Sequence, residues 1–81
     1  MQCSIYRSEK KMDTYLYIIE ENNLNQLPEG LDKLLGRLEF VMELDLEKIK
    51  RLENADLDEV KQRLTEAGFY LQLPRDLHIS V

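Results

Sequence analysis

The stretch that decides the fold is residues 54–74, which read Asn-Ala-Asp-Leu-Asp-Glu-Val-Lys-Gln-Arg-Leu-Thr-Glu-Ala-Gly-Phe-Tyr-Leu-Gln-Leu-Pro. Within it, Asp56 can cap a helix, and Glu59 can reach back to that cap from three residues further along. Apolar residues then recur at helical spacing, at Leu57, Val60, Leu64 and Ala67. The pattern predicts an amphipathic helix over 56–67.

A strand is predicted directly after this helix. Gly68 stands where the end of a helix favours a positive φ, and residues 69–73 then switch to a period of two. The apolar face of this strand is Phe69, Leu71 and Leu73. Pro74 ends the strand, because proline has no N–H to donate to a ladder. Core packing leaves Tyr70 and Gln72 unexplained, which makes both of them candidate interaction residues.

Two further strands are predicted near the N-terminus. Residues 2–8 alternate between apolar and polar side chains, and residues 14–19 are rich in β-branched and aromatic side chains. In the second segment, both the odd-numbered and the even-numbered positions are largely apolar. We therefore expect it at the centre of a sheet, with both of its faces covered.

A helix is predicted over 28–36. Pro28 suits the first helical position, where its missing N–H would be unpaired in any case, and Glu29 suits the positive end of the helix dipole. Gly30 lies inside this segment and weakens it by roughly 1 kcal/mol relative to alanine. Gly36 is the expected stop.

The segment between the two helices predicts a strand and then a short helical piece. Residues 39–44 alternate, and the side chains expected to face the core are Phe40, Met42 and Leu44. Residues 46–52 carry an apolar residue every three positions, which predicts a short helix or a 3₁₀ turn. The predicted order is β-β-α-β-(short α)-α-β in a single domain over 1–81. It predicts an α+β fold, an α/β/α sandwich with one four-stranded, largely antiparallel sheet.

Composition restricts the classes of function. Hydrophobic residues at 43% and charged residues at 33% of 81 residues are typical of an ordinary globular domain. No apolar run approaches the roughly 20 residues that span a bilayer, and strand-like sequence begins at the N-terminus, so we expect a cytoplasmic protein without membrane contact. The net charge of −5 disfavours non-specific attraction to nucleic acid or to an anionic membrane.

Catalytic and metal-binding patterns are weak. Cys3 and His78 could suggest a nucleophile and a base, but Cys3 lies in a predicted strand and is better explained as a small buried hydrophobe. As the single cysteine of the chain, it forms no internal disulfide and indicates a reducing compartment. Asp56, Asp58 and Glu59 suggest a divalent-cation site, yet helix capping is favoured. We expect no catalytic residue, no cofactor and no metal.

Interaction is the function that the remaining residues favour. The first hypothesis is a non-enzymatic module that binds another protein, because Tyr and Arg are enriched at the energetic centres of interfaces. The alternative is an RNA-associated accessory protein, in which a basic cluster and tyrosines on the sheet contact bases. The net charge and the strand order disfavour this alternative. The candidate interaction residues are Tyr6, Arg7, Tyr17, Lys48, Lys50, Arg51, Tyr70 and Gln72.

Several blocks of sequence stand in a distinctive order along essentially the whole chain. They are Cys3, Ile5-Tyr6-Arg7-Ser8, Thr14-Tyr15-Leu16-Tyr17, Leu27-Pro28, Asn54-Ala55-Asp56 and Gly68-Phe69-Tyr70-Leu71-Gln72-Leu73-Pro74. With these blocks the chain resembles the YcgL family of small bacterial proteins. The resemblance implies a four-stranded sheet between helices in a monomeric cytoplasmic protein of gammaproteobacterial type. It implies no established activity or cofactor, and it implies that relatives carry a further polar tail beyond the position of Val81.

Overall fold

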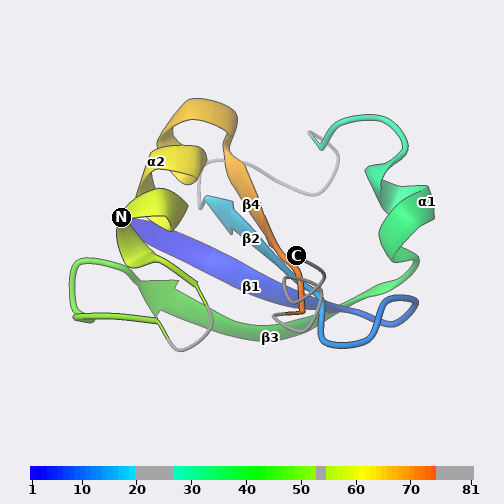
Figure 1. Cartoon of the computed structure of the whole chain (residues 1–81), viewed down its shortest axis with the longest axis horizontal. Coiled ribbons are helices and arrows are strands. Elements are labelled where there is room, and N and C mark those ends of the chain that lie inside the picture. Colours follow the sequence, from blue (N-terminus) through cyan, green and yellow to red (C-terminus); the bar gives the residue numbers. More distant parts are fainter. Residues whose placement is uncertain (20–26, 53–54, 75–81) are drawn as a thin grey trace, which may run out of the picture.

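The structure is a computed structural model that describes residues 1–19, 27–52 and 55–74. In chain order, the elements are β1 (Gln2–Ser8), β2 (Tyr15–Ile19), α1 (Leu31–Leu35), β3 (Leu38–Asp45), α2 (Leu57–Ala67) and β4 (Phe69–Gln72) (Figure 1). The four strands form one sheet in the order β3-β1-β2-β4, and each neighbouring pair is antiparallel. The predicted α+β class and the four-stranded antiparallel sheet are confirmed.

The two helices cover opposite faces of the sheet. Strand β2 lies inside the sheet, and its successive side chains point to alternate faces. Tyr17 belongs to a core cluster with Leu64 of α2, whereas Leu16 and Ile18 belong to a second cluster with Leu35 of α1. The predicted burial of this strand on both faces is therefore confirmed, and the layers follow the order helix, sheet, helix.

Helix α2 has the N-cap at Asp56 and the stop at Gly68 that the sequence predicts, whereas the Glu59 carboxylate, expected to reach back to the cap, accepts a hydrogen bond from the Tyr70 hydroxyl. The Asp56 side chain accepts hydrogen bonds from the backbone N–H groups of Asp58, at 2.9 Å, and Glu59, at 3.3 Å. At the other end, Gly68 has a φ of 86°, and its N–H donates to the carbonyl oxygen of Leu64 at 3.0 Å. The Asp56 carboxylate therefore caps the helix, as the sequence favours over a cation site.

Helix α1 is shorter than predicted. It spans Leu31–Leu35, and the prediction that the helix begins at Pro28 is wrong. The physical reason is Gly30, which has a φ of 91° and takes the N-cap position. A left-handed residue cannot continue a right-handed helix, so Gly30 stands before the helix and not within it. The predicted stop at Gly36 is confirmed.

The predicted short helix over 46–52 is wrong. These residues form a turn followed by irregular chain, with one turn-type hydrogen bond from the Lys48 N–H to the Asp45 carbonyl oxygen at 3.0 Å. The apolar residues at every third position are instead the side chains that this irregular segment places in the core. Leu46 is fully buried, and Ile49 and Leu52 pack against the cluster beneath α2.

Strand β3 departs from the predicted alternation. Ile5 of β1 pairs with Met42 and Tyr6 pairs with Phe40, so Val41 is an extra residue that forms a β-bulge. One extra residue turns the following side chains to the other face. Met42 therefore lies on the α2 side with Ile5, and Phe40 on the α1 side with Tyr6. The prediction that Phe40 and Met42 share one inward face is wrong.

Strand β4 ends at Gln72, one residue earlier than predicted. Phe69 and Leu71 pack against the cluster beneath α1, as expected for the apolar face of this strand. Leu73 lies beyond the last pair of the ladder, which joins Tyr15 to Gln72, and its side chain is exposed. The prediction that Leu73 faces the core is therefore wrong.

Candidate functional site

A buried hydrogen bond connects two of the candidate residues. The Tyr17 hydroxyl donates to the Oε1 atom of Gln72 at 2.7 Å, and the two residues are only 5% and 8% exposed. Burial raises the pKa of Tyr17 to about 12, with smaller contributions from Cys3, Tyr70 and Tyr15. Tyr17 is therefore a neutral donor at physiological pH. This bond explains Gln72, which core packing had left unexplained at the sequence level, as a partner within the fold.

Tyr70 lies beside this bond and is half-buried. Its ring meets the ring of Tyr17 edge to face, with centroids 5.7 Å apart, and its hydroxyl donates to Oε1 of Glu59 at 3.3 Å. Desolvation raises the pKa of Tyr70, and the Glu59 carboxylate raises it further. Tyr70 also lines a groove of about 300 Å³ between α2 and β4, together with Glu59 and Arg63.

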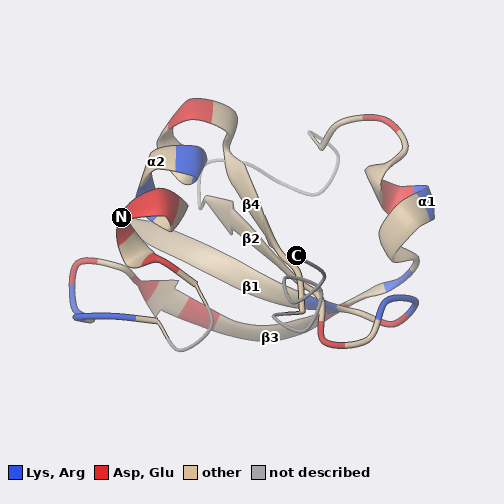
Figure 2. Cartoon of the chain, in the orientation of Figure 1, with Lys and Arg blue, Asp and Glu red and all other residues tan. Residues whose placement is uncertain are grey.

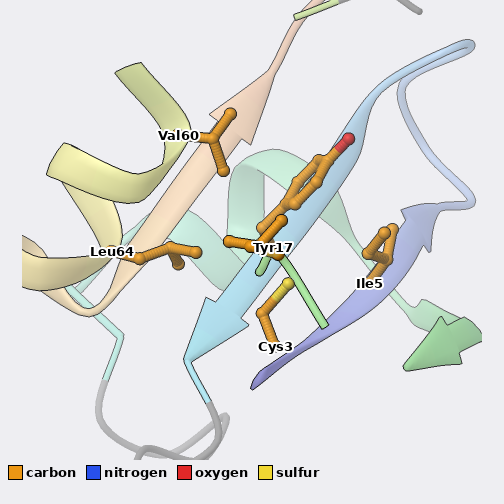
Figure 3. Close-up of a cluster of buried hydrophobic side chains, with 6 residues drawn as sticks. Cys3, Ile5, Tyr17, Val60 and Leu64 are labelled. Atoms are coloured by element: carbon orange, nitrogen blue, oxygen red, sulfur yellow. The ribbon is translucent and has the colours of Figure 1, made fainter. Parts of the chain in front are cut away.

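Cys3 is buried in the cluster beneath α2, where Figure 3 shows it on the same side of the sheet as Tyr17 and Leu64. Burial raises the pKa of the Cys3 thiol from 9.0 to about 11, against the opposing effect of the N-terminal amino group. The nucleophilic form of cysteine is the thiolate, which this environment disfavours. The prediction that Cys3 is a small buried hydrophobe is confirmed, and His78, its suggested base, lies outside the described residues.

The basic cluster of Lys48, Lys50 and Arg51 is exposed in the loop that follows β3 (Figure 2). The apolar residues of this loop pack beneath α2. Tyr6 packs on the α1 side of the sheet, opposite to the loop. Tyr17 is on the same side as the loop, but it is buried in the cluster beneath α2. The structure therefore does not join the basic cluster and these tyrosines into one open surface. Association with RNA stays a prediction.

Tyr6 and Arg7 both contact β3. The Tyr6 ring packs edge to face on the ring of Phe40, with centroids 5.7 Å apart. The Arg7 guanidinium forms a hydrogen-bonded ion pair with Glu39. Two candidate residues from the sequence thus support the outer strand of the sheet from its inner neighbour, β1.

Strand β3 exposes two residues, Phe40 and Met42, that the sequence predicts to face the core. Phe40, Val41 and Met42 are 55%, 45% and 44% exposed, although all three are apolar. Strand β3 is an edge strand of the sheet, and the described residues supply no strand to pair with its outer edge. We call these three residues, with Glu39 and Glu43 on either side of them, the β3 edge surface. A sequence signal was present, because three consecutive apolar residues interrupt the alternation at the bulge.

None of the described helices combines the length and the apolar character needed to cross a bilayer. Within the same residues, no cluster of three or more His, Cys, Asp or Glu side chains is placed to hold a metal ion.

Comparison with known proteins assigns the chain to a family. The family model of the YcgL domain matches residues 3–75. A YcgL domain-containing protein of Proteus mirabilis (strain HI4320) is 50% identical over 74 residues, which cover 91% of this chain and 76% of the relative. Protein YcgL of Escherichia coli (strain K12 / DH10B) is 49% identical over 87 aligned positions, which cover 100% of this chain and 81% of that protein. On the extent of these matches, the chain belongs to the YcgL-domain family.

Proposed function

We propose that this YcgL-domain protein is a non-enzymatic interaction module of the bacterial cytoplasm, and that it binds another protein through the β3 edge surface. The observation that carries the proposal is the exposure of Phe40, Val41 and Met42 together on an outer strand. Exposed apolar residues that follow one another along an unpaired strand edge mark a site of contact with other molecules. Aromatic side chains and methionine are also enriched at the centres of interfaces.

The backbone of β3 supports binding by strand addition. One edge of β3 pairs with β1 from Gln2–Asp45 to Ser8–Leu38, and the other edge faces outward. An outward edge presents N–H and C=O groups that an extended segment of a partner can pair with. The contacts of Tyr6 and Arg7 hold β3 in place before binding, which reduces the entropy lost on association.

The chemistry of the core supports a binding role over catalysis. Among the residues that the structure describes, the pKa is raised for Cys3, Tyr17 and Tyr70, and for each of them burial is the main cause. Each shift favours the neutral form, and each side chain packs in a structural cluster. A cytoplasmic location is in keeping with the buried free thiol of Cys3.

Site-specific photo-crosslinking in living bacteria tests this function. A benzophenone amino acid placed at position 41 is expected to form a discrete covalent adduct with another protein. The same amino acid at position 32, which is exposed on α1, is the matched control and is expected to form none. Mass spectrometry of the adduct identifies the partner.

The specificity of that adduct is tested with two double variants in which apolar residues become serine. Phe40→Ser with Met42→Ser is expected to abolish the adduct, because both side chains belong to the β3 edge surface. Met12→Ser with Leu34→Ser, which removes exposed apolar side chains elsewhere, is expected to leave it unchanged. Equal adducts from positions 41 and 32, or an adduct that survives the first double variant, would contradict the proposal. So would an adduct that contains only two copies of this chain.

A further inference from the structure

The apolar centre of the β3 edge surface lies between two carboxylates. Glu39 pairs across the ladder with Arg7, and Glu43 pairs with Ser4. The Glu39 side chain stays 53% exposed although it is in an ion pair, and Glu43 is exposed opposite a neutral residue. Strand β3 contains no basic residue. A segment that adds to its outer edge therefore meets negative charge on both sides of the apolar centre.

Strand β1 shows which side-chain pattern fits β3. Read along β1, Ser4, Ile5, Tyr6 and Arg7 lie opposite Glu43, Met42, Phe40 and Glu39. Four residues of β1 span five residues of β3, because Val41 is bulged. The central two positions of β1 are apolar, and the position opposite Glu39 is basic. Side chains directly across a ladder share one face, so the same pairing logic applies to a strand on the outer edge.

Charge repulsion disfavours a second copy of the chain on this edge in two registers. An antiparallel pair of β3 strands centred on Val41 places Glu39 opposite Glu43 of the other copy, and one centred on Met42 places Glu39 opposite Asp45. Like charges directly across a ladder are destabilising, and each chain also has a net charge of −5. Three exposed apolar side chains are also few for a stable dimer, which typically buries about 800 Å² on each partner. A single extended segment needs less area.

We infer that the occupant of the β3 edge surface is an extended segment of another protein, added antiparallel to β3, in which two apolar residues stand between two basic residues. This inference rests on the proposed function and names the chemistry of the partner. The basic residues lie opposite Glu43 and Glu39, and the apolar residues lie opposite Met42 and Phe40. The bulge places the two carboxylates on opposite faces of the sheet, as a regular strand of this pattern requires.

A peptide titration followed by NMR tests the inference on the full chain. The probe is the acetylated and amidated peptide Ser-Thr-Lys-Ile-Tyr-Arg-Thr-Ser, added to ¹⁵N-labelled protein at low salt. Amide shift changes are expected to centre on β3. A peptide with both basic residues replaced by glutamate is expected to bind about tenfold more weakly, since two favourable cross-strand pairs become repulsive. A peptide with proline in place of isoleucine is expected not to bind, because proline has no backbone N–H to donate and so disfavours pairing inside a ladder.

A charge exchange separates attraction at this site from general attraction between a cation and an acidic protein. The variant Glu43→Lys is expected to bind the basic peptide more weakly than the wild type does. It is expected to bind more tightly a peptide in which only the lysine is replaced by glutamate. The matched control Glu66→Lys, on the exposed side of α2, makes the same charge change away from β3 and is expected to leave this preference unaltered.

Each other outcome of the titration overturns the inference. Equal binding of the basic and acidic peptides would show that the carboxylates do not select the partner. Shift changes away from β3, or no binding of the basic peptide, would remove the segment from this edge. Concentration-dependent shifts on β3 without peptide would identify a second copy as the occupant. Crosslinking from position 41 decides the proposed function separately, because a cellular adduct with a partner that lacks this pattern refutes the inference alone.

Discussion

Replacing Leu64 with alanine is expected to lower the free energy of unfolding by about 2–5 kcal/mol. Leu64 is 1% exposed and reaches from α2 toward Tyr17 and Cys3 (Figure 3). The substitution removes buried methyl groups and leaves a cavity between the helix and the sheet, which the surroundings fill only in part. Because domains of this kind are stable by roughly 5–15 kcal/mol in total, this loss is a large fraction of the whole.

The matched control is Leu34→Ala on α1. Leu34 is 43% exposed, so removal of the same atoms is expected to change stability by only about 0.5 kcal/mol or less. Urea unfolding followed by circular dichroism measures both variants, and the midpoint is expected to fall for Leu64→Ala while the slope stays that of the wild type. Equal effects from the two variants would mean that α2 does not pack on the sheet as described.

Replacing Tyr17 with phenylalanine is expected to cost about 1–3 kcal/mol, because it leaves the Gln72 Oε1 atom buried without its donor. The ring remains, so its edge-to-face contact with Tyr70 is kept. Gln72→Leu is expected to have a similar cost, since it leaves the Tyr17 hydroxyl unpaired. Urea unfolding of the two single variants and of the double variant measures the coupling between the pair.

The double variant distinguishes a paired bond from two independent polar groups. With both partners made apolar, no unpaired group is left, and the total loss is expected to be smaller than the sum of the two single losses. Additive losses would mean that the Tyr17–Gln72 bond does not contribute to the folded state.

The pH dependence of the same variants gives a second measurement of this hydroxyl. Burial raises the pKa of Tyr17 from 10.0 to about 12, so the folded state holds this proton more tightly than the unfolded state. Its contribution to stability is complete below pH 10.0 and is lost as the pH rises toward about 12. Midway between these values, the wild type is expected to have lost more stability than Tyr17→Phe, each relative to neutral pH. Equal losses would contradict a buried Tyr17 hydroxyl.

The parts of the fold that depend on neighbours along the chain can be predicted from the sequence. The Asp56 cap, the Gly68 stop and the apolar spacing between them specify α2 through contacts within a few residues. The apolar residues on both faces of β2 predict that this strand lies inside the sheet, because only a covered strand can bury both of its faces. The same local logic placed Cys3 in the core. None of these patterns depends on which strand becomes its neighbour.

Other features depend on contacts between strands that are distant in the sequence. Gln72 accepts from Tyr17, 55 residues earlier in the chain, and this pairing depends on the order of strands in the sheet. The register of β3 against β1 decided that Val41 is bulged, which separates Phe40 from Met42. The outer position of β3 left these residues exposed. The physical reason is the same in each case: an apolar strand pattern specifies a need for cover, whereas pairing across the sheet decides which side chains receive it.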